Sequence, residues 1–336
     1  MAAPWPEIAI VVPVLNEARW IDACLRSLLQ QDAGGDYAIM VVDGGSTDGT
    51  LASVAEWARR DPRITAHHNP HRRQAAAFNL AARIADPGVR VLVRADAHAA
   101  YPPNFLRHCV TSLATRNATS VVVPMHTVGT CAFQRAAAAA QNSRLGNGGS
   151  AHRSAGVSRF VDHGHHAAFD RAFFTAVGGY DTRFSHNEDA EHDIRAHAVG
   201  GRIWLCAEAA VTYYPRDSIR GLAIQYYRHG RGRARTLRLH AIRPRVRQMI
   251  PVAVLGGVAF GVVLSSVSPW FMLLPASYAA VCAGWSAWRA AAARDPALLL
   301  SAPALMAMHL AWACGAIRET LASRLRPNHR HRPQEG

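Results

Sequence analysis

The sequence predicts an α/β domain built on a doubly wound, mostly parallel sheet, followed by apolar helices that can cross a membrane. The first observation is that continuous apolar runs alternate with helical segments over roughly the first hundred residues. Strands that are apolar on both faces are typical of parallel sheets covered by helices. The second observation is that residues 248–288 contain no charged side chain. A bilayer-spanning helix needs roughly 20 apolar residues, so this run has room for two.

Each expected element of the α/β domain follows from its own local pattern. Short, uniformly apolar runs predict buried strands, whereas the segment 19–31 places Ile21, Leu25 and Leu28 on one helical face. In chain order the patterns predict strand 8–14, helix 19–31, strand 37–42, helix 51–60, strand 64–66, helix 73–84 and strand 89–94. The stretch 117–160 is rich in Ala, Gly and Ser, and we interpret it as a less regular, loop-containing part of the same domain.

Polar side chains follow three of the predicted strands. Asn16, Asp43 and Asp96 each lie just beyond a strand's C-terminal end. In open parallel sheets, ligands bind at the carboxyl ends of the strands. This edge is therefore where we expect the chemistry of the domain.

The basic residues are concentrated in the last third of the chain. All 37 are arginine; residues 1–215 carry 20 Arg and 19 acids, whereas residues 216–336 carry 17 Arg and 4 acids. Arginines that flank apolar runs are typical of a membrane surface. No zinc-finger, RNA-recognition or homeodomain signature is present in the sequence. We therefore expect membrane lipid, and not nucleic acid, as a partner.

These shifts in composition predict four regions. They are the α/β domain at 1–215, a basic amphipathic interfacial segment at 216–247, a membrane region with two to three transmembrane helices at 248–318, and a basic tail at 319–336. The uncharged run divides near residues 265–269, and 296–317 is the third candidate span. Three full spans would place the arginine-rich tail outside, against the positive-inside tendency, so one of them is open to interpretation as a re-entrant or interfacial helix. Buried core helices are the alternative interpretation of all three.

The composition also excludes several chemistries. Without lysine, the chain lacks the amine that a Walker-type phosphate loop, a Schiff base or a pyridoxal-phosphate enzyme requires. The six cysteines form no Cys-x-x-Cys pair, so we expect neither a disulfide framework nor a zinc site. The first apolar run is short, contains Pro13 and stops at Asn16, so we expect no signal peptide and a cytoplasmic first domain.

Two segments at the strand ends carry the most specific signal. Residues 12–17 read Val-Pro-Val-Leu-Asn-Glu, and residues 43–48 read Asp-Gly-Gly-Ser-Thr-Asp. The second segment is a tight glycine-rich turn whose backbone is open to a ligand. Each segment has a plainer alternative, because Asn16 or Glu17 would also cap the first helix, and Ser46 or Asp48 the second.

Taken together, the two segments resemble the family-2 glycosyltransferases of the GT-A fold, which use nucleotide-diphosphate sugars. Within that family the chain is most similar, over about residues 8–235, to enzymes of succinoglycan exopolysaccharide synthesis. The resemblance implies that Pro13, Asn16, Glu17 and Asp43 hold the nucleotide, with uridine as the favoured nucleoside. It also makes residues 1–215 a GT-A catalytic domain.

Further positions bear on the donor diphosphate and its metal. Arg73 begins a predicted helix at the ligand edge, where a guanidinium suits a diphosphate, although a solvated surface charge is the alternative. The family carries an Asp-x-Asp motif for Mn²⁺ or Mg²⁺ where this chain has Asp96-Ala97-His98. The resemblance therefore implies a divalent metal held by Asp96 and His98, and the imidazole suits Mn²⁺ better than Mg²⁺.

Two more segments bear on the acceptor and the chemical step. The resemblance implies contacts to the acceptor or the diphosphate from Gly179 and Glu188, and the histidine cluster adds His165 and His166 as candidates. It assigns the general base to Asp189, because an inverting transfer needs one carboxylate to take the acceptor's hydroxyl proton. The alternative interpretation is that the acidic residues around Asp189 lie at a solvent-exposed helix start.

The segment 225–233 bears on processivity. Processive relatives carry Gln-x-x-Arg-Trp here; Gln225 and Arg228 match that motif as acceptor contacts, but His229 stands in place of the Trp. The aromatic wall for a growing polymer is missing, which favours single-sugar addition. A basic helix that binds anionic lipid is the alternative.

The predicted function is that of a membrane-anchored inverting glycosyltransferase. We expect it to move a sugar from a nucleotide-diphosphate donor, with a UDP-sugar favoured, to a lipid-linked saccharide in exopolysaccharide biosynthesis. The resemblance places it in the inner (cytoplasmic) membrane, with the catalytic domain facing the cytoplasm. A processive polysaccharide synthase or a polyprenyl-phosphate sugar transferase is the alternative on the same scaffold. A non-enzymatic membrane scaffold is the alternative from another class.

Overall fold

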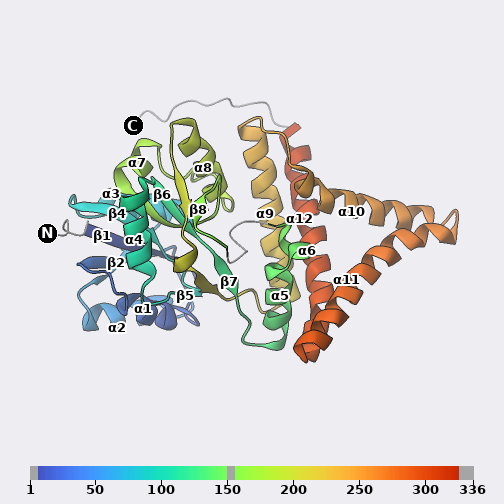
Figure 1. Ribbon diagram of the computed structural model, residues 1–336, viewed down its shortest axis with the longest axis horizontal. Helices are drawn as coiled ribbons and strands as arrows, with labels where there is room; N and C mark the ends of the chain where they lie inside the picture. Colours follow the sequence, from blue (N-terminus) through green and yellow to red (C-terminus); the bar gives the residue numbers. More distant parts are fainter. Residues whose placement is uncertain (1–6, 150–155, 325–336) are drawn as a thin grey trace. The chain divides into compact units, whose positions relative to one another are not determined.

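The structure is a computed structural model that describes residues 7–149 and 156–324 of the chain. It divides into two compact units, one up to Pro215 and one from Arg216 onward. The first unit holds the strands, and the second is entirely helical in its described residues (Figure 1).

The first part of the sheet confirms the predicted alternation of strands and helices. Four strands pair in parallel in the order β3-β2-β1-β4. The elements are β1 (Glu7–Val14), α1 (Ile21–Leu29), β2 (Tyr37–Asp43), α2 (Thr50–Arg60), β3 (Ile64–His68), α3 (Gln74–Ile84) and β4 (Val89–Arg94). Each lies within a few residues of its predicted range.

Both faces of this sheet are covered, as the uniformly apolar strands predicted. In β1, Ile8 and Ile10 belong to a core with α1, α2 and α4 (Phe105–Arg116), whereas Ala9 and Val11 belong to a second core with α3. Alternate side chains of one strand point to opposite faces, so a strand buried on both sides must be apolar throughout.

Residues 117–160 are more regular than the sequence analysis expected. They contain β6 (Ser120–Val123), β7 (Met125–Thr127), α5 (Ala132–Asn142), α6 (Arg144–Asn147) and β8 (Arg159–Phe160). Helix α5 buries Ala136, Ala137 and Ala140. The buried face of α5 also carries Gln134 and Gln141, polar residues that a search for apolar positions does not count as core, so the helix was missed.

The remaining strands make the sheet mixed. Its full order is β3-β2-β1-β4-β9-β6-β10-β8, in which β9 (His165–Asp170) runs antiparallel between β4 and β6. Because β9 runs the other way, its first residues lie at the carboxyl ends of its neighbours. The other elements of the unit are β5 (Ala99–Ala100), α7 (Arg171–Ala176), α8 (Glu188–Ala198), β10 (Ile203–Leu205) and β11 (Val211–Tyr213), of which β5, β11 and β7 form a second sheet.

The second unit contains four long helices. They are α9 (Ile219–Leu239), α10 (Val246–Leu264), α11 (Leu273–Ala293) and α12 (Ser301–Arg324). The break between α10 and α11 falls where the sequence placed it. Two stretches of the described chain are long and apolar enough to cross a membrane, Val246–Leu264 and Pro296–Ala322.

Helices α9 and α12 lie side by side along most of their length (Figure 1). They approach so closely that a Cβ atom on Gly230 would lie 2.0 Å from the carbonyl oxygen of Trp312. The reverse holds at Gly315, whose added Cβ would lie 2.0 Å from the oxygen of Tyr227. Glycine at both positions therefore lets the two backbones touch.

Candidate active site at the strand ends

The loops after β1 and β2 are joined by hydrogen bonds. The amide of Asn16 donates to Ser46 Oγ at 2.9 Å, and Asn16 Oδ1 accepts from the amide of Thr47 at 2.8 Å. Asn16 adopts a φ of 59°, a left-handed conformation that asparagine tolerates better than most residues. The two polar segments that the sequence singled out thus form one structure.

Asp43 is the buried centre of this pair of loops. Its carboxylate accepts from the amide of Gly45 at 2.7 Å and from the hydroxyl of Ser46 at 2.5 Å. Asp43 therefore orders its own turn. The N-cap of α2 is Gly49, which makes no side-chain cap hydrogen bond, while Asp48 Oδ1 accepts from the amide of Thr50 at 3.1 Å. The other polar groups of the loops after β1 and β2 lie at the carboxyl edge of the sheet.

Glu17 and His98 meet across the same edge. Glu17 Oε1 lies 3.2 Å from His98 Nδ1, and the amide of Glu17 donates to Thr50 Oγ1 at 2.9 Å. Pro13 is placed differently, because it lies inside β1 and pairs in register with Val42 of β2. Pro13 therefore shapes the strand end.

Asp96 lies just beyond the end of β4 and is almost enclosed. Its Oδ1 accepts from Gln74 Nε2 at 2.8 Å, and its Oδ2 lies 3.7 Å from His165 Nε2. Burial opposes its ionisation, but Arg94, His165 and His98 outweigh that effect and lower the pKa of Asp96 to about 2. The carboxylate is therefore charged at neutral pH.

His165 was predicted as an acceptor or diphosphate contact, and the structure places it beside Asp96. Burial lowers the pKa of His165 to about 4, so its ring is neutral at physiological pH. A neutral imidazole beside an ionised carboxylate suits a metal such as Mn²⁺, which accepts both nitrogen and oxygen ligands. Asp96 Oδ2 and His165 Nε2 thus offer one oxygen and one nitrogen donor 3.7 Å apart.

Glu188 and Asp189 open helix α8. Glu188 is 5% exposed, and Glu191 and Asp193 are each 1% exposed, so this acidic run is not a solvated helix face. Asp189 itself is half-buried. Burial opposes its ionisation, but His163, His166 and Arg94 outweigh that effect and lower its pKa. A base must be ionised before it can take a proton, and Asp189 meets that requirement.

A buried network stands behind this helix start. His166 Nδ1 lies 2.7 Å from the hydroxyl of Tyr180, and His166 Nε2 lies 2.7 Å from Asp193 Oδ1. Asp193 Oδ2 lies 2.7 Å from His163 Nδ1. The structure therefore places His166 in the interior as a hydrogen-bonding bridge.

His192 joins the same cluster but lacks hydrogen bonds. Both of its ring nitrogens are buried without a partner among the described residues. Ligand atoms of His166, His192 and Asp193 lie within 4.8 Å of one another. Buried ring nitrogens without a hydrogen bond are rare in folded proteins. Burial also lowers the pKa of the His192 ring.

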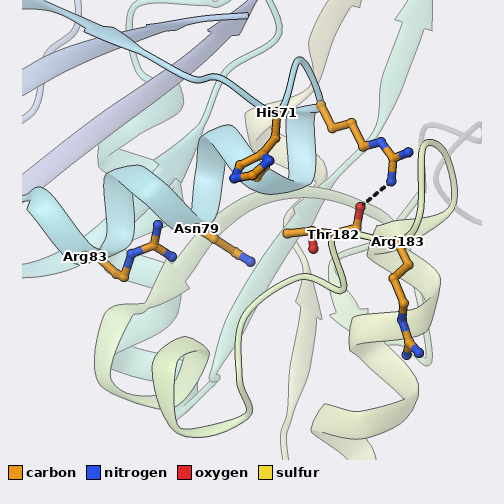
Figure 2. A pocket seen from close by; sticks show the side chains of 7 residues that line it. His71, Asn79, Arg83, Thr182 and Arg183 are labelled. Atoms are coloured by element: carbon orange, nitrogen blue, oxygen red, sulfur yellow. Dashed lines mark hydrogen bonds between the residues drawn. The ribbon is translucent and has the colours of Figure 1, made fainter. Parts of the chain in front are cut away.

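Arg73 lies on the rim of a cavity of about 400 Å³ beside α3. Its guanidinium donates to the carbonyl of Thr182 at 2.7 Å, the bond drawn dashed in Figure 2. His71, Arg83 and Arg183 also line this cavity, which gives it a basic surface. Arg73 thus connects the start of α3 to the loop that leads into α8.

The three remaining predicted residues lie in the loop before α8 and in helix α9. Gly179 has a φ of 63°, and an added Cβ would lie 2.6 Å from Asn79 Oδ1, so only glycine fits. Gln225 and Arg228 lie in α9, which belongs to the second unit.

Several residues of this site escaped the sequence analysis. Arg94, Tyr180 and Asp193 are buried and bonded to predicted residues, and Gln74 donates to Asp96. For Arg94 a signal existed, because a charge at the end of an otherwise apolar strand is costly unless it is paired. Tyr180 and Asp193 gave no such local signal.

Comparison with known proteins identifies similar chains over most of the length. The model of the family described as Glycosyl transferase family 2 matches residues 9–178. The chain is 44% identical over 318 residues to the succinoglycan biosynthesis protein ExoA of Rhizobium meliloti (strain 1021), which covers 94% of this chain and 96% of that protein.

Two more distant similarities are of different kinds. A dolichyl N-acetyl-α-D-glucosaminyl phosphate 3-β-D-2,3-diacetamido-2,3-dideoxy-β-D-glucuronosyltransferase of Methanococcus voltae is 32% identical over 104 residues, covering 30% of this chain and 32% of that protein. Among solved structures, the mannosyltransferase PcManGT of Pyrobaculum calidifontis, in complex with GDP-Man and Mn²⁺, superposes with a TM-score of 0.58. That match covers 94% of this chain and 87% of the other at 21% identity, and it shows a shared fold.

Proposed function

The chain belongs to glycosyl transferase family 2 and is a glycosyltransferase of the GT-A fold, and from this premise we propose the reaction at its strand-end site. We propose an inverting transfer of one sugar from a UDP-sugar to a lipid-linked saccharide during succinoglycan-type exopolysaccharide synthesis. The observation that carries the proposal is that Asp96, beside β4, and Glu188, next to Asp189, share one buried cation, Arg94.

In this proposal Asp189 is the general base. Its carboxylate takes the proton of the acceptor hydroxyl as that oxygen attacks the anomeric carbon. The new carbon–oxygen bond forms while the bond from the anomeric carbon to the diphosphate oxygen breaks, and the nucleoside diphosphate leaves. The carboxylate is ionised before the step, and its lowered pKa also makes it a weaker proton acceptor than an ordinary aspartate.

The donor would lie along the carboxyl edge of the sheet. We assign the nucleoside to the joined loops that contain Asn16, Glu17 and Asp43, with Pro13 fixing the strand end, and the diphosphate to Arg73 and the region of Asp96. Asp96, His98 and His165 would hold the divalent metal, which neutralises charge on the departing diphosphate when it is bound. Mn²⁺ in the complex of the structurally similar mannosyltransferase supports a metal of this class.

The acceptor side is assigned to residues near α8. Glu188 is the first residue of that helix, and the carbonyl of Gly179 accepts from Arg195 in its last turn. His166 is fully buried and supports the helix through Asp193. We also assign Gln225 and Arg228 of α9 to the acceptor, because they match the motif of processive relatives. The His in place of the motif's Trp supports addition of a single sugar.

The second unit is the proposed membrane anchor. Two of its stretches are apolar enough to span a bilayer, and large apolar side chains such as Phe260, Val263 and Trp270 are exposed on it. Exposed apolar area of this extent marks contact with lipid or with another protein. A lipid-linked acceptor at the cytoplasmic face of the inner membrane would then meet the enzyme where it is anchored.

Release of UDP from a panel of UDP-sugars tests the proposal. Purified full-length protein in detergent is supplied with a membrane lipid extract as acceptor source, in Mn²⁺, in Mg²⁺ and in EDTA. We expect metal-dependent release with one sugar, and a loss of roughly 10²–10⁴-fold in Asp189→Asn. Glu56→Gln, an exposed acid on α2, is the matched control and should keep the wild-type rate.

Two results would contradict the proposal. Full activity in Asp189→Asn would remove the base assignment, and the absence of both UDP release and UDP binding would remove the donor assignment. Product length separates single addition from the processive alternative: one added sugar supports the proposal, whereas a polymer ladder supports a synthase. Transfer of the sugar to polyprenyl phosphate alone would support a polyprenyl-phosphate sugar transferase.

A further inference from the structure

Arg94 is a buried cation at the end of an apolar strand. It is the last residue of β4 and only 7% exposed, and the residues before it, Val91, Leu92 and Val93, are core residues. A buried charge is costly unless it is paired and hydrogen-bonded. Its partners should therefore show what the charge does.

The guanidinium contacts groups from three separate segments. Its Nε lies 3.4 Å from Asp96 Oδ1, directly beyond β4. One terminal nitrogen donates to Glu188 Oε1 at 3.2 Å and to the hydroxyl of Tyr180 at 3.4 Å. Arg94 therefore bridges the carboxylate proposed to hold the metal and the residue next to the proposed base.

The far side of this bridge is itself anchored. Tyr180 reaches His166 of β9, and His166 reaches Asp193, one helical turn beyond Asp189 on α8. The hydrogen-bonded chain Arg94–Tyr180–His166–Asp193 thus returns to the helix that Glu188 begins. Both ends of the first turn of α8 are held to the sheet by buried polar contacts.

We propose that Arg94 is a positioning residue, which sets the distance between Asp96 and the Glu188–Asp189 corner of α8. The inference rests on the proposed function, since it assumes that Asp189 acts on an acceptor beside a donor held near Asp96. Arginine is suited to this task because its planar fork presents donors in several fixed directions. A lysine ammonium at the same place is a single point of charge on a flexible stem.

Two variants separate a positioning role of Arg94 from a contribution to stability: one removes the charge of Arg94 alone, and the other removes the charges of Arg94 and Glu188 together. Arg94→Met leaves Asp96 and Glu188 buried without their cation, so we expect Tm to fall by roughly 6–20 °C. Well below Tm, kcat for UDP release should fall about 100-fold, because a misplacement of about an ångström costs that much. The Kd for UDP with Mn²⁺, measured by calorimetry, should stay within about threefold of wild type.

The double variant Arg94→Met/Glu188→Gln is the decisive protein. It removes both charges of the Arg94–Glu188 pair and leaves Asp96 without its cation, so Tm should recover part of the loss while kcat stays low. Glu188→Gln is measured alongside, and the double variant should lose no more kcat than the worse single variant, because the two residues act as one unit. Arg94→Lys should keep most of the stability and lose roughly tenfold in kcat.

The matched control is a variant that removes the hydrogen bonds of an arginine lying away from the site. Arg171 donates to the carbonyls of Ala82, Ala85, Asp86 and Val89. Arg171→Met should therefore lower Tm and leave kcat unchanged below the transition.

The outcomes that overturn the inference are specific. Recovery of kcat together with Tm in the double variant would make Arg94 purely structural. A loss of UDP affinity equal to the loss of kcat would make it a donor-binding residue instead. If Arg94→Met fails to fold, the double variant and Arg94→Lys still decide between these results. A wild-type chain that neither binds nor releases UDP would overturn the proposed function, and the positioning role with it.

Discussion

Replacing Gly230 by alanine should destabilise the helical second unit. Gly230 lies in α9, where it faces the backbone of α12, and an added Cβ would lie 2.0 Å from the carbonyl oxygen of Trp312 and 3.1 Å from the amide nitrogen of Ala316. These neighbours are backbone atoms and cannot rotate away. The two helices would therefore have to separate by about 1.4 Å to restore an ordinary contact of about 3.4 Å.

The size of the effect follows from two opposing terms. Inserting a methyl group into a tight contact typically costs about 1–3 kcal/mol, and a separation above 1 Å also weakens the dispersion contacts along the helix pair. Alanine favours the helix over glycine by only about 1 kcal/mol. We expect a net loss of about 1–3 kcal/mol in Gly230→Ala, and the same direction in Gly315→Ala, whose Cβ would lie 2.0 Å from the oxygen of Tyr227.

The assay is thermal unfolding of the full chain in detergent, followed by far-ultraviolet circular dichroism. Tm should fall by roughly 2–12 °C in Gly230→Ala. Gly256 and Gly257 of α10 have nothing within 4 Å of an added Cβ, so Gly256→Ala is the control and should be neutral or stabilising. If Gly230→Ala melts as high as Gly256→Ala, the close crossing of α9 and α12 does not exist and the reasoning fails.

Three further predictions concern the first unit. Asp43→Ala should cost about 1–3 kcal/mol, because its buried carboxylate orders its own turn, and should weaken UDP binding in calorimetry; unchanged Tm and Kd would argue against that role. Burial holds His192 neutral with its pKa below the usual 6.5, so the unfolded chain takes up the proton first and stability is lost as pH falls below about 6.5. His165, with a pKa of about 4, adds a loss of stability of the same sign as pH falls. When urea unfolding is measured at pH 7 and pH 5, His192→Phe should therefore lose part, but not all, of the pH dependence of stability. Asp96→Asn should abolish saturable Mn²⁺ binding in calorimetry, and a wild-type isotherm would place the metal elsewhere.

Much of the fold was predictable because its signals are local. Buried parallel strands are short apolar runs wherever they occur, and the turns after β1 and β2 contain the polar and glycine residues that such turns need. Alanine-rich α5 was missed because its buried face includes the polar residues Gln134 and Gln141. The uncharged run of the second unit was equally plain, since length and composition alone decide whether a helix can span a bilayer.

The site was predictable only in part. Asp43 and Asp96 stand next to strands that local patterns identify, so their positions at the sheet edge could be expected, whereas Asp189 was assigned only through the family resemblance. His165 and His166 are adjacent in sequence, yet one lies beside Asp96 and the other bridges Tyr180 and Asp193. Neighbours on a strand point to opposite faces, so only the placement of β9 in the sheet separates their surroundings.

The sequence by itself determined the order of strands and helices up to β4, the polar turns at their ends and the family to which the chain belongs. The tertiary structure alone decided which charges meet. Arg94 and Glu188 are 94 positions apart in the chain. They become partners because β9 leads the chain toward the start of β4, and α7 with residues 177–187 then brings the start of α8 back to the end of that strand. Local pattern fixes periodicity and turns, whereas the pairing of a buried charge depends on long-range packing that excludes water from both partners.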